Sequence, residues 1–313
     1  MLMGGTMLAV TQDVLGGPEV LQAREVPRPI PAIGEVLVRA RAVGVNPADE
    51  MNRRTGVFSG EPPFILGWDV SGEVAAVGPG VTVVRPGDEV FGLLPFPRGS
   101  GAYAEYVIGP ARAFVPKPAS LSHVEAAALP LAGLTAWQAL VETAGVGART
   151  RVLITGAAGG VGHLAVQIAA ARGAHVIALT STGNVDAVRT YGATEVVDYR
   201  TTDFAEAIDR VDVVLDVVGG VYPLRALQVL KPGGTLVSTL PQSLAPAVQG
   251  AREADVRLAG LFVESDRLGL TALAELAEAG SLRPNVVATH ALQDASAAHS
   301  LNHAPGKVVL TVA

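Results

Sequence analysis

The feature that most constrains the fold is a glycine-rich turn between two apolar segments. Residues 152–155 (VLIT) have the composition of a buried strand, residues 156–162 (GAAGGVG) contain four glycines, and residues 163–171 have the pattern of a helix. The apolar run from 152 to 171 is about long enough to span a bilayer, but four glycines in seven residues would interrupt a spanning helix. We therefore interpret the segment as strand, turn and helix, and predict no transmembrane segment.

The spacing inside this turn matches a dinucleotide-binding fingerprint. Ala157, Gly159 and Gly162 take its three positions, with alanine in place of the first glycine. Small residues there keep the turn tight, let the backbone approach a pyrophosphate and let the helix pack against its strand, and free N–H groups at the helix start bind the anion. A turn that serves only close packing is the alternative. A triphosphate-binding loop is excluded because no Gly-Lys-Ser/Thr follows.

Apolar runs alternate with helical segments after residue 151. The runs predicted as strands are residues 152–155, 176–180, 195–198, 211–216, 235–239 and 256–262. Buried strands connected by helices indicate an α/β class with a Rossmann doubly wound parallel sheet. In the strand order 3-2-1-4-5-6 the last strand lies at an edge.

The rest of the chain has a different pattern of predicted secondary structure. Residues 6–118 consist of short β-rich runs separated by turns, and Ser122 to Glu125 form a capping box that starts a helix. After the sixth strand we predict helices at 268–279 and 294–303 and strands at 286–290 and 307–312, in a tail that returns to the first domain. The predicted domains are residues 1–125 with 266–313, mostly β, and residues 126–265, which bind the dinucleotide.

Charge and cysteine content exclude several functions. The formal net charge of -6 argues against nucleic acid as the main partner. The chain has no cysteine, which excludes disulfides, thiolate nucleophiles and cysteine-based metal sites. Its six histidines lack the spacing of paired metal ligands, so no metal site is predicted. The absence of cysteine and of a recognisable secretory signal predicts a cytoplasmic protein without membrane attachment.

The end of the second predicted strand indicates which cofactor is bound. Enzymes that bind unphosphorylated NAD place Asp or Glu there to bind the ribose hydroxyls, whereas this chain has Thr180, Ser181 and Thr182. Hydroxyl groups without a carboxylate leave room for the extra phosphate, so NADPH is predicted. Arg189 and Arg200 are candidates for the cation that meets this phosphate. A polar strand end without a role is the alternative.

Short segments in a fixed order indicate a family. They are residues 46–49 (NPAD), 67–72 (GWDVSG), 133–136 (GLTA), 156–162, 212–216 (DVVLD), 231–234 (KPGG) and 306–310 (GKVVL). Together they resemble the zinc-independent quinone oxidoreductases (ζ-crystallin-like) of the medium-chain dehydrogenase/reductase superfamily. This resemblance implies a GroES-like barrel domain beside the Rossmann domain. Zinc-dependent relatives carry Cys and His where this chain has Asn46 and Trp68.

The resemblance also implies the site residues. Asn46 is the expected catalytic residue, facing the acceptor oxygen and touching the cofactor, and Thr135 is expected near the nicotinamide. The remaining expected cofactor contacts are Gly159, Gly160 and Val161 at the pyrophosphate, Ser181, Asn184 and Tyr199 at the adenosine phosphate, and Val217, Val218, Leu240, Phe262 and Val263 at the nicotinamide. Asn46 and Asp49 alternatively cap a turn, and Trp68 and Phe64 belong either to the acceptor pocket or to the core.

The predicted function is metal-free hydride transfer from NADPH to a quinone or an α,β-unsaturated carbonyl. Without a Lewis acid a plain ketone is a poor acceptor, whereas a conjugated acceptor spreads the arriving negative charge onto oxygen. The alternative is an NADPH-binding sensor or interaction protein with little turnover. The apolar last strand, residues 256–263, predicts a homodimer that pairs two sheet edges.

Overall fold

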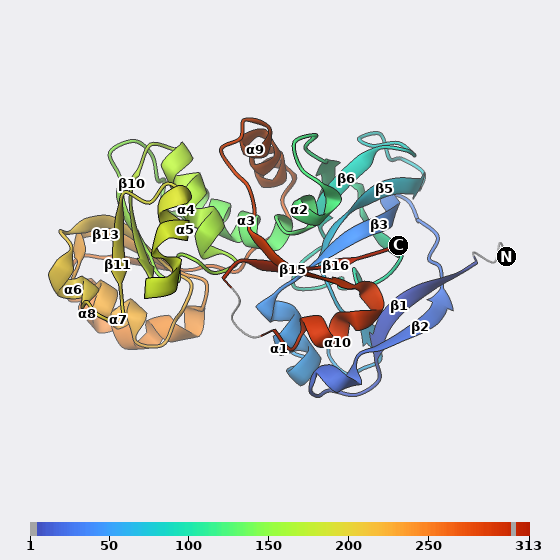
Figure 1. Ribbon diagram of the computed structural model, residues 1–313, viewed down its shortest axis with the longest axis horizontal. Coiled ribbons are helices and arrows are strands. Elements are labelled where there is room, and N and C mark those ends of the chain that lie inside the picture. Colours follow the sequence, from blue (N-terminus) through green and yellow to red (C-terminus); the bar gives the residue numbers. More distant parts are fainter. Residues whose placement is uncertain (1–4, 302–304) are drawn as a thin grey trace. The chain divides into compact units, whose positions relative to one another are not determined.

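The computed structural model describes residues 5–301 and 305–313. The chain divides into two compact units (Figure 1). The first unit consists of Met1–Leu134 together with Glu264–Ala313, and the second unit is the continuous segment Thr135–Val263. Within the described residues, no helix has both the length and the apolar character needed to cross a membrane.

The second unit is built on a six-stranded sheet whose pairings are all parallel. Its strands are β9 (Arg151–Ile154), β10 (His175–Thr180), β11 (Glu195–Asp198), β12 (Val211–Asp216), β13 (Leu230–Ser238) and β14 (Arg257–Gly260). Their order is β11-β10-β9-β12-β13-β14, which confirms the predicted doubly wound arrangement. β13 begins earlier than the predicted residues 235–239, because the strand includes a Pro-Gly-Gly segment at which its register with β12 shifts.

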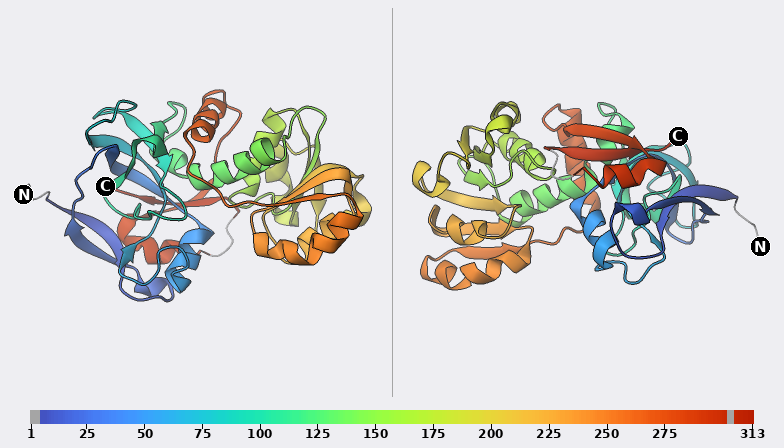
Figure 2. Two further views of the ribbon diagram at one scale, coloured as in Figure 1. Left: turned by 180° about the vertical axis from the view of Figure 1, so that it is seen from behind. Right: turned by 60° about the horizontal axis from the view of Figure 1, so that its bottom comes forward.

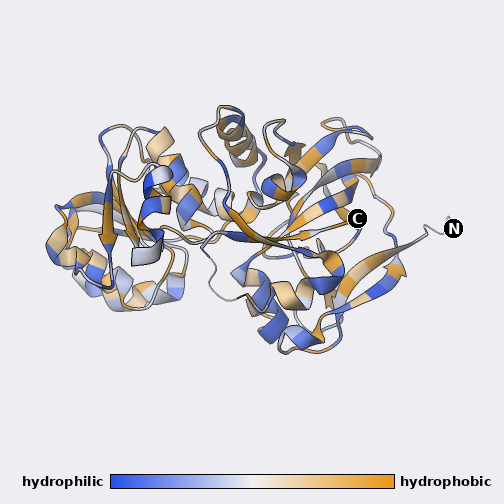
Figure 3. Ribbon diagram, viewed as in Figure 1, coloured by the Kyte–Doolittle hydropathy of each residue, from blue (hydrophilic) through white to orange (hydrophobic). Residues whose placement is uncertain are grey.

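Helices cover this sheet on both faces. α4 (Gly162–Ala171) and α5 (Val185–Thr190) lie on one side, and α7 (Tyr222–Ala226) and α8 (Val248–Glu253) lie on the other (Figure 2). α6 (Phe204–Ala207) lies between β11 and β12 in the sequence, and α3 (Pro130–Trp137) begins in the first unit and ends in the second. The strands between them are predominantly hydrophobic (Figure 3), as expected for a sheet buried on both faces.

The first unit is mostly β, as predicted. β1 (Thr6–Gln12), β2 (Gln22–Pro27) and β4 (Phe64–Ile65) form a three-stranded sheet in the order β2-β1-β4. A second sheet has the order β15 (Val286–Ala291), β16 (Lys307–Thr311), β3 (Glu35–Val45), β5 (Asp69–Val77), β6 (Glu89–Leu93) and β8 (Phe114–Pro116), with β7 (Tyr106–Pro110) also paired to β3. β16 pairs antiparallel with β3, so a strand from the far end of the chain lies inside this sheet.

The helices of the first unit are α1 (Pro47–Thr55), α2 (His123–Ala127), α9 (Arg267–Glu278) and α10 (Ala295–Ala298). The predicted capping box is confirmed at α2, where Ser122 Oγ accepts from the Glu125 N–H at 3.2 Å and the Glu125 carboxylate accepts from the Ser122 N–H at 2.9 Å. The last predicted helix was too long, because α10 ends at Ala298 and the next residue, His299, turns inward. Residues 302–304, within its predicted range, lie outside the described part of the chain.

Candidate functional site

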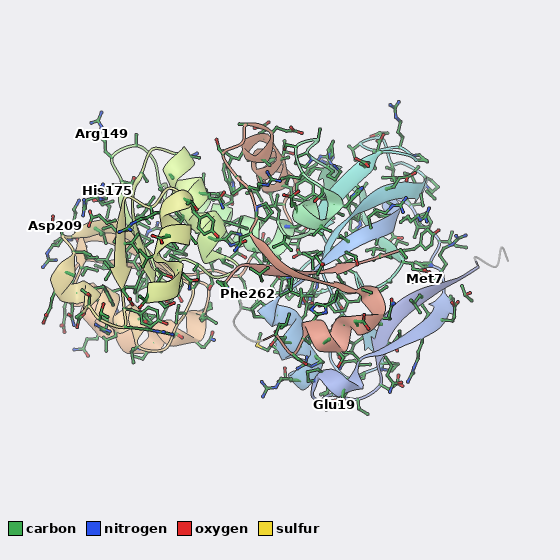
Figure 4. All side chains as sticks on the ribbon, viewed as in Figure 1. Met7, Glu19, Arg149, His175, Asp209 and Phe262 are labelled. Carbon is green, nitrogen blue, oxygen red and sulfur yellow. The ribbon has the colours of Figure 1, made fainter. Side chains whose placement is uncertain are left out.

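The predicted cofactor residues of the second unit gather at one edge of its sheet. Gly159, Gly160 and Val161 follow β9, Ser181 and Asn184 follow β10, Tyr199 follows β11, Val217 and Val218 follow β12, Leu240 follows β13, and Phe262 and Val263 follow β14. Because the strands are parallel, their carboxyl ends share this edge, which is where doubly wound sheets bind ligands. Figure 4 shows Phe262 at this end of the unit and His175, Arg149 and Asp209 at the opposite end. Thr135 lies on α3 and is buried.

The glycine turn has the shape required to hold a pyrophosphate. A Cβ atom on Gly162 would lie 2.1 Å from the carbonyl oxygen of Gly156, so only glycine lets α4 start this close to the turn. Gly156 itself has φ +58°, a left-handed conformation that favours glycine. In residues 5–301 and 305–313, the N–H groups of Gly160, Val161 and Gly162 find no hydrogen-bond acceptor. These free donors at a helix start fit an anionic cofactor.

Asp216 organises the middle of the same edge, a role that sequence reasoning missed. Its buried carboxylate accepts hydrogen bonds from Thr155 Oγ1 at 3.0 Å and from Ser238 Oγ at 2.8 Å. It also accepts from the N–H groups of Val218 at 3.2 Å and Gly219 at 3.0 Å. One side chain thus fixes the ends of β9, β12 and β13 relative to one another. The sequence signals were an aspartate as the last residue of an apolar strand and its place in the segment 212–216.

The end of β10 forms a compact polar cluster. Asn184 Nδ2 donates to Ser181 Oγ at 3.0 Å, which brings two predicted adenosine-phosphate residues together. Tyr199 is anchored by its N–H, which donates to the carbonyl of Thr180 at 3.1 Å, and its ring is exposed. The hydroxyl of Thr182 donates to the carboxylate of Asp198 at the end of β11. Sequence reasoning looked for an acid only after the second strand and therefore missed Asp198.

Asn46 lies in the first unit, immediately before α1, and its side chain is 2% exposed. Its Nδ2 donates to Asp69 at 2.8 Å, and its Oδ1 accepts from the ammonium group of Lys307, which also donates to the Val45 carbonyl at 3.1 Å. These bonds fix which way the carboxamide faces. One Nδ2 hydrogen remains without an acceptor among the described residues, and the Lys307 charge polarises the amide toward stronger donation.

A second buried chain of polar groups lies beside Asn46. Asp49 accepts from the Asn46 N–H at 2.8 Å, so it does cap the start of α1. Arg53 donates to His299 Nδ1 at 2.8 Å, which leaves the proton of the neutral ring on Nε2, facing the Tyr103 hydroxyl at 2.9 Å. Burial, together with the charge of Arg53, lowers the pKa of His299 to about 3, and burial raises the pKa of Asp49 to about 8.

The two aromatic candidates occupy different places in the first unit. Trp68 is fully buried and packs edge-on against Phe58 and Phe96, with ring centroids 5.8 and 5.1 Å away. Phe64 instead lines a mostly apolar cavity of about 450 Å³ together with Met7, Pro63 and Tyr106. The indole N–H of Trp68 is buried without a hydrogen-bond partner among the described residues.

One arrangement in the first unit has the connectivity of a hydrolytic triad. Ser71 Oγ lies 2.8 Å from His123 Nδ1, and His123 Nε2 lies 3.2 Å from Glu89. A nucleophilic serine must reach its substrate. Ser71 is fully buried and donates its hydroxyl proton to the Val90 carbonyl at 3.2 Å. The cluster therefore joins β5, β6 and α2 structurally and offers no hydrolytic site.

The described residues contain no group of three or more His, Cys, Asp or Glu side chains arranged to hold a metal ion. His303 lies outside those residues. The side-chain oxygen of Asn46 is not a free metal ligand, because it already accepts a hydrogen bond from the ammonium group of Lys307.

Two family models match parts of the chain. Residues 32–119 match the alcohol dehydrogenase GroES-like domain, and residues 191–310 match a family described as zinc-binding dehydrogenase.

Similar proteins cover nearly the whole chain. The chloroplast envelope quinone oxidoreductase homolog of Arabidopsis thaliana is 32% identical over 94% of this chain and 95% of its own length. The solved quinone oxidoreductase of Coxiella burnetii is 35% identical, with a TM-score of 0.91 over 98% of this chain and all of that one. The Escherichia coli quinone oxidoreductase complexed with NADPH is 28% identical, with a TM-score of 0.87 over 97% of this chain and 99% of the other.

Proposed function

The chain belongs to the quinone oxidoreductase family of the medium-chain dehydrogenase/reductase superfamily, and from this premise we propose that it reduces small quinones or α,β-unsaturated carbonyls with NADPH. The observation that carries the proposal is the edge of the second unit at which its parallel strands end. A close-packed glycine turn lies there, and three of its N–H groups have no acceptor among the residues the structure describes. That edge suits a dinucleotide.

Different residues of this edge would bind different parts of the cofactor. The N–H groups of Gly160, Val161 and Gly162 would bind its pyrophosphate, and the cluster of Ser181, Asn184 and Tyr199 would hold the adenosine end. Val217, Val218, Leu240, Phe262 and Val263 would line the nicotinamide side, with Thr135 near it. When bound, NADPH supplies the hydride, and the protein supplies position.

Asn46 is proposed to bind the acceptor oxygen. Its Oδ1 is held by Lys307 and one Nδ2 hydrogen by Asp69, so the remaining hydrogen has a fixed direction. An oriented donor stabilises the negative charge that a conjugated acceptor gains on its oxygen when it takes up a hydride. This stabilisation takes the place of a metal, which is why quinones and enones are proposed as acceptors and unconjugated ketones are not.

The decisive experiment is NADPH oxidation followed at its absorbance maximum with a panel of quinones, enones and saturated ketones. We expect rapid oxidation with the conjugated acceptors only. Replacing Asn46 with Leu should lower kcat with the conjugated acceptors by a much larger factor than it raises the NADPH Kd. Tight NADPH binding without turnover on any acceptor would contradict the proposal and favour a sensor or interaction protein.

NADPH is proposed over NADH because no carboxylate follows β10 itself. Ser181 lies in the polar cluster beside Asn184, so the Ser181→Asp variant places a negative charge there. It should weaken NADPH binding at least tenfold and NADH binding little. Wild-type protein that binds NADH as tightly as NADPH would refute the preference.

A homodimer is proposed through residues 256–263. β14 is the last strand of its sheet, and Leu258 and Ala259 are only partly buried. A second copy that pairs antiparallel with this edge would satisfy its backbone groups. Sedimentation should show a dimer that Leu258→Pro disrupts and Leu258→Ala, which keeps the backbone N–H, does not. A monomeric wild type, or a folded dimeric proline variant, would disprove this interface.

We further propose that the protein works in the cytoplasm, as its cysteine-free sequence suggests. Cell fractionation with an antibody against the chain tests this, and recovery in an organelle or membrane fraction would refute it.

A further inference from the structure

The carboxylate of Asp198 lies next to the proposed adenosine site, and none of the roles described above uses it. β10 and β11 run parallel with Thr180 opposite Asp198, so the two strands end at the same level of the sheet. The N–H of Tyr199 continues the pairing by donating to the Thr180 carbonyl at 3.1 Å. Asp198 consequently leaves the sheet beside the segment that carries Ser181 and Asn184.

Both oxygens of this carboxylate are held in place. Thr182 Oγ1 donates to Oδ2, and the N–H of Arg200 donates to Oδ1 at 3.0 Å. These two bonds, that of Thr182 first, lower the pKa of Asp198, which keeps it ionised at neutral pH. Among the described residues, no cationic side chain forms an ion pair with it within 4.0 Å. A negative charge that is held by two hydrogen bonds and by no ion pair therefore borders the adenosine site, and the charge of Arg200 acts on it only from beyond 4.0 Å.

We infer that Asp198 is a specificity-determining residue that limits how strongly the site prefers a phosphorylated nicotinamide cofactor. This inference rests on the proposed function, in which Ser181, Asn184 and Tyr199 surround the adenosine ribose. A phosphate on the ribose brings negative charge toward the carboxylate, and the two repel. The ribose hydroxyl of NADH carries no charge, so the carboxylate does not repel it.

Thr182 is the positioning residue for this effect. Its hydroxyl bond holds the carboxylate on the side of β10, whereas the Arg200 N–H alone would leave one oxygen free to turn toward solvent. The ends of β10 and β11 thus have opposite effects on NADPH binding. No acid follows β10, which leaves room for the phosphate, whereas Asp198 at the end of β11 reduces the affinity gained from that phosphate.

The test measures the Kd of NADPH and of NADH by titration calorimetry for wild type, Asp198→Asn and Thr182→Val. Asparagine keeps the shape and can still accept from Thr182 but has no charge. We expect Asp198→Asn to lower the NADPH Kd about tenfold at low salt and to leave the NADH Kd within about twofold. Thr182→Val should change the NADPH Kd in the same direction by a smaller factor.

Asp209→Asn is the matched control, because it removes the same charge at the opposite end of the second unit (Figure 4); neither Kd should change. The difference between Asp198→Asn and wild type should shrink as salt is raised from 20 to 500 mM, because salt screens exposed charges. An unchanged ratio of the two Kd values, or weaker NADH binding with constant NADPH binding, would overturn the inference. Binding without acceptor-dependent oxidation would refute only the proposed function, and a wild type that binds neither cofactor would refute both.

Discussion

At the scale of single residues, the glycine turn has no room for a side chain at Gly162. A Cβ atom there would overlap the Gly156 carbonyl oxygen, which belongs to backbone and cannot rotate away. Gly162→Ala should therefore lower the free energy of unfolding by about 1–3 kcal/mol and weaken NADPH binding at least tenfold. Chemical unfolding and cofactor titration measure the two effects.

Gly147→Ala in the same unit provides the comparison, because a Cβ atom on Gly147 meets nothing within 4 Å. Its free energy of unfolding should change by less than about 0.5 kcal/mol. Equal effects of the two substitutions would show that the turn tolerates a methyl group and that the close packing argument is wrong.

Two buried groups in the first unit titrate in opposite senses. The pKa of Asp49 is raised to about 8, so between about pH 4 and 8 the folded state keeps a proton that the unfolded state loses, and stability falls as pH rises. The pKa of His299 is lowered to about 3, so between about pH 3 and 6.5 the unfolded state binds a proton that the folded state lacks, and stability falls as pH drops. The effects cancel between about pH 4 and 6.5.

Asp49→Asn should separate the two titrations. The variant should lose the decline in stability between about pH 6.5 and 8, and it should lose up to about 1.4 kcal/mol per pH unit as pH falls below about 6.5. Unfolding by urea at a series of pH values measures this profile. Asp186→Asn, at a side chain that is 99% exposed, should retain the wild-type profile. A profile of Asp49→Asn that matches wild type would contradict the assignment.

At the scale of secondary-structure elements, β16 contributes to stability because it lies inside a sheet. Leu310 on this strand pairs opposite Val43 and is 0% exposed, so Leu310→Ala should cost about 2–5 kcal/mol. Leu268→Ala on α9, where the side chain is 80% exposed, should cost less than about 0.5 kcal/mol. Thermal and chemical unfolding compare them, and similar losses would mean that β16 is not an integral strand.

The strands of the second unit and the helix after its glycine turn could be predicted from sequence because each follows a local rule. Buried parallel strands are continuous apolar runs, and the glycine turn marks where the first strand meets its helix. Tertiary contacts decided the exceptions. β13 contains a Pro-Gly-Gly segment, which local propensity assigns to a turn, at the point where its pairing with β12 shifts register. In the first unit, α10 ends before His299, which bonds to Arg53 and Tyr103 far away in sequence.

The same distinction holds for the candidate site. Residues that follow strand ends could be named from the sequence, since strand order alone brings them to one edge. Asp198 could not, because its importance depends on register: it lies opposite Thr180, and Thr182 then bonds to it. Lys307 could not either, because its bond to Asn46 spans most of the chain.

At the scale of the whole molecule, the proposed chemistry requires no metal ion. Among the residues the structure describes, no cluster of three or more metal-ligand side chains exists, and Asn46 is committed to Lys307 and Asp69. Incubation with EDTA should therefore leave kcat and KM for a quinone unchanged, and added zinc should not raise activity. Activity that is lost on chelation and restored by zinc would refute a metal-free mechanism.

The placement of β16 also determines the order in which the molecule is assembled during synthesis. Lys307 bonds to the carbonyl of Val45, a residue translated 262 positions earlier, and all of the second unit is made in between. The second unit can thus fold while residues 42–45 of β3 have no β16 to pair with, although β5 and β7 are already present, and other nascent chains can pair with this open edge. The middle of the chain is synthesised before the first unit is complete, so we expect this edge to be open to aggregation and to chaperones until residue 307 has been translated.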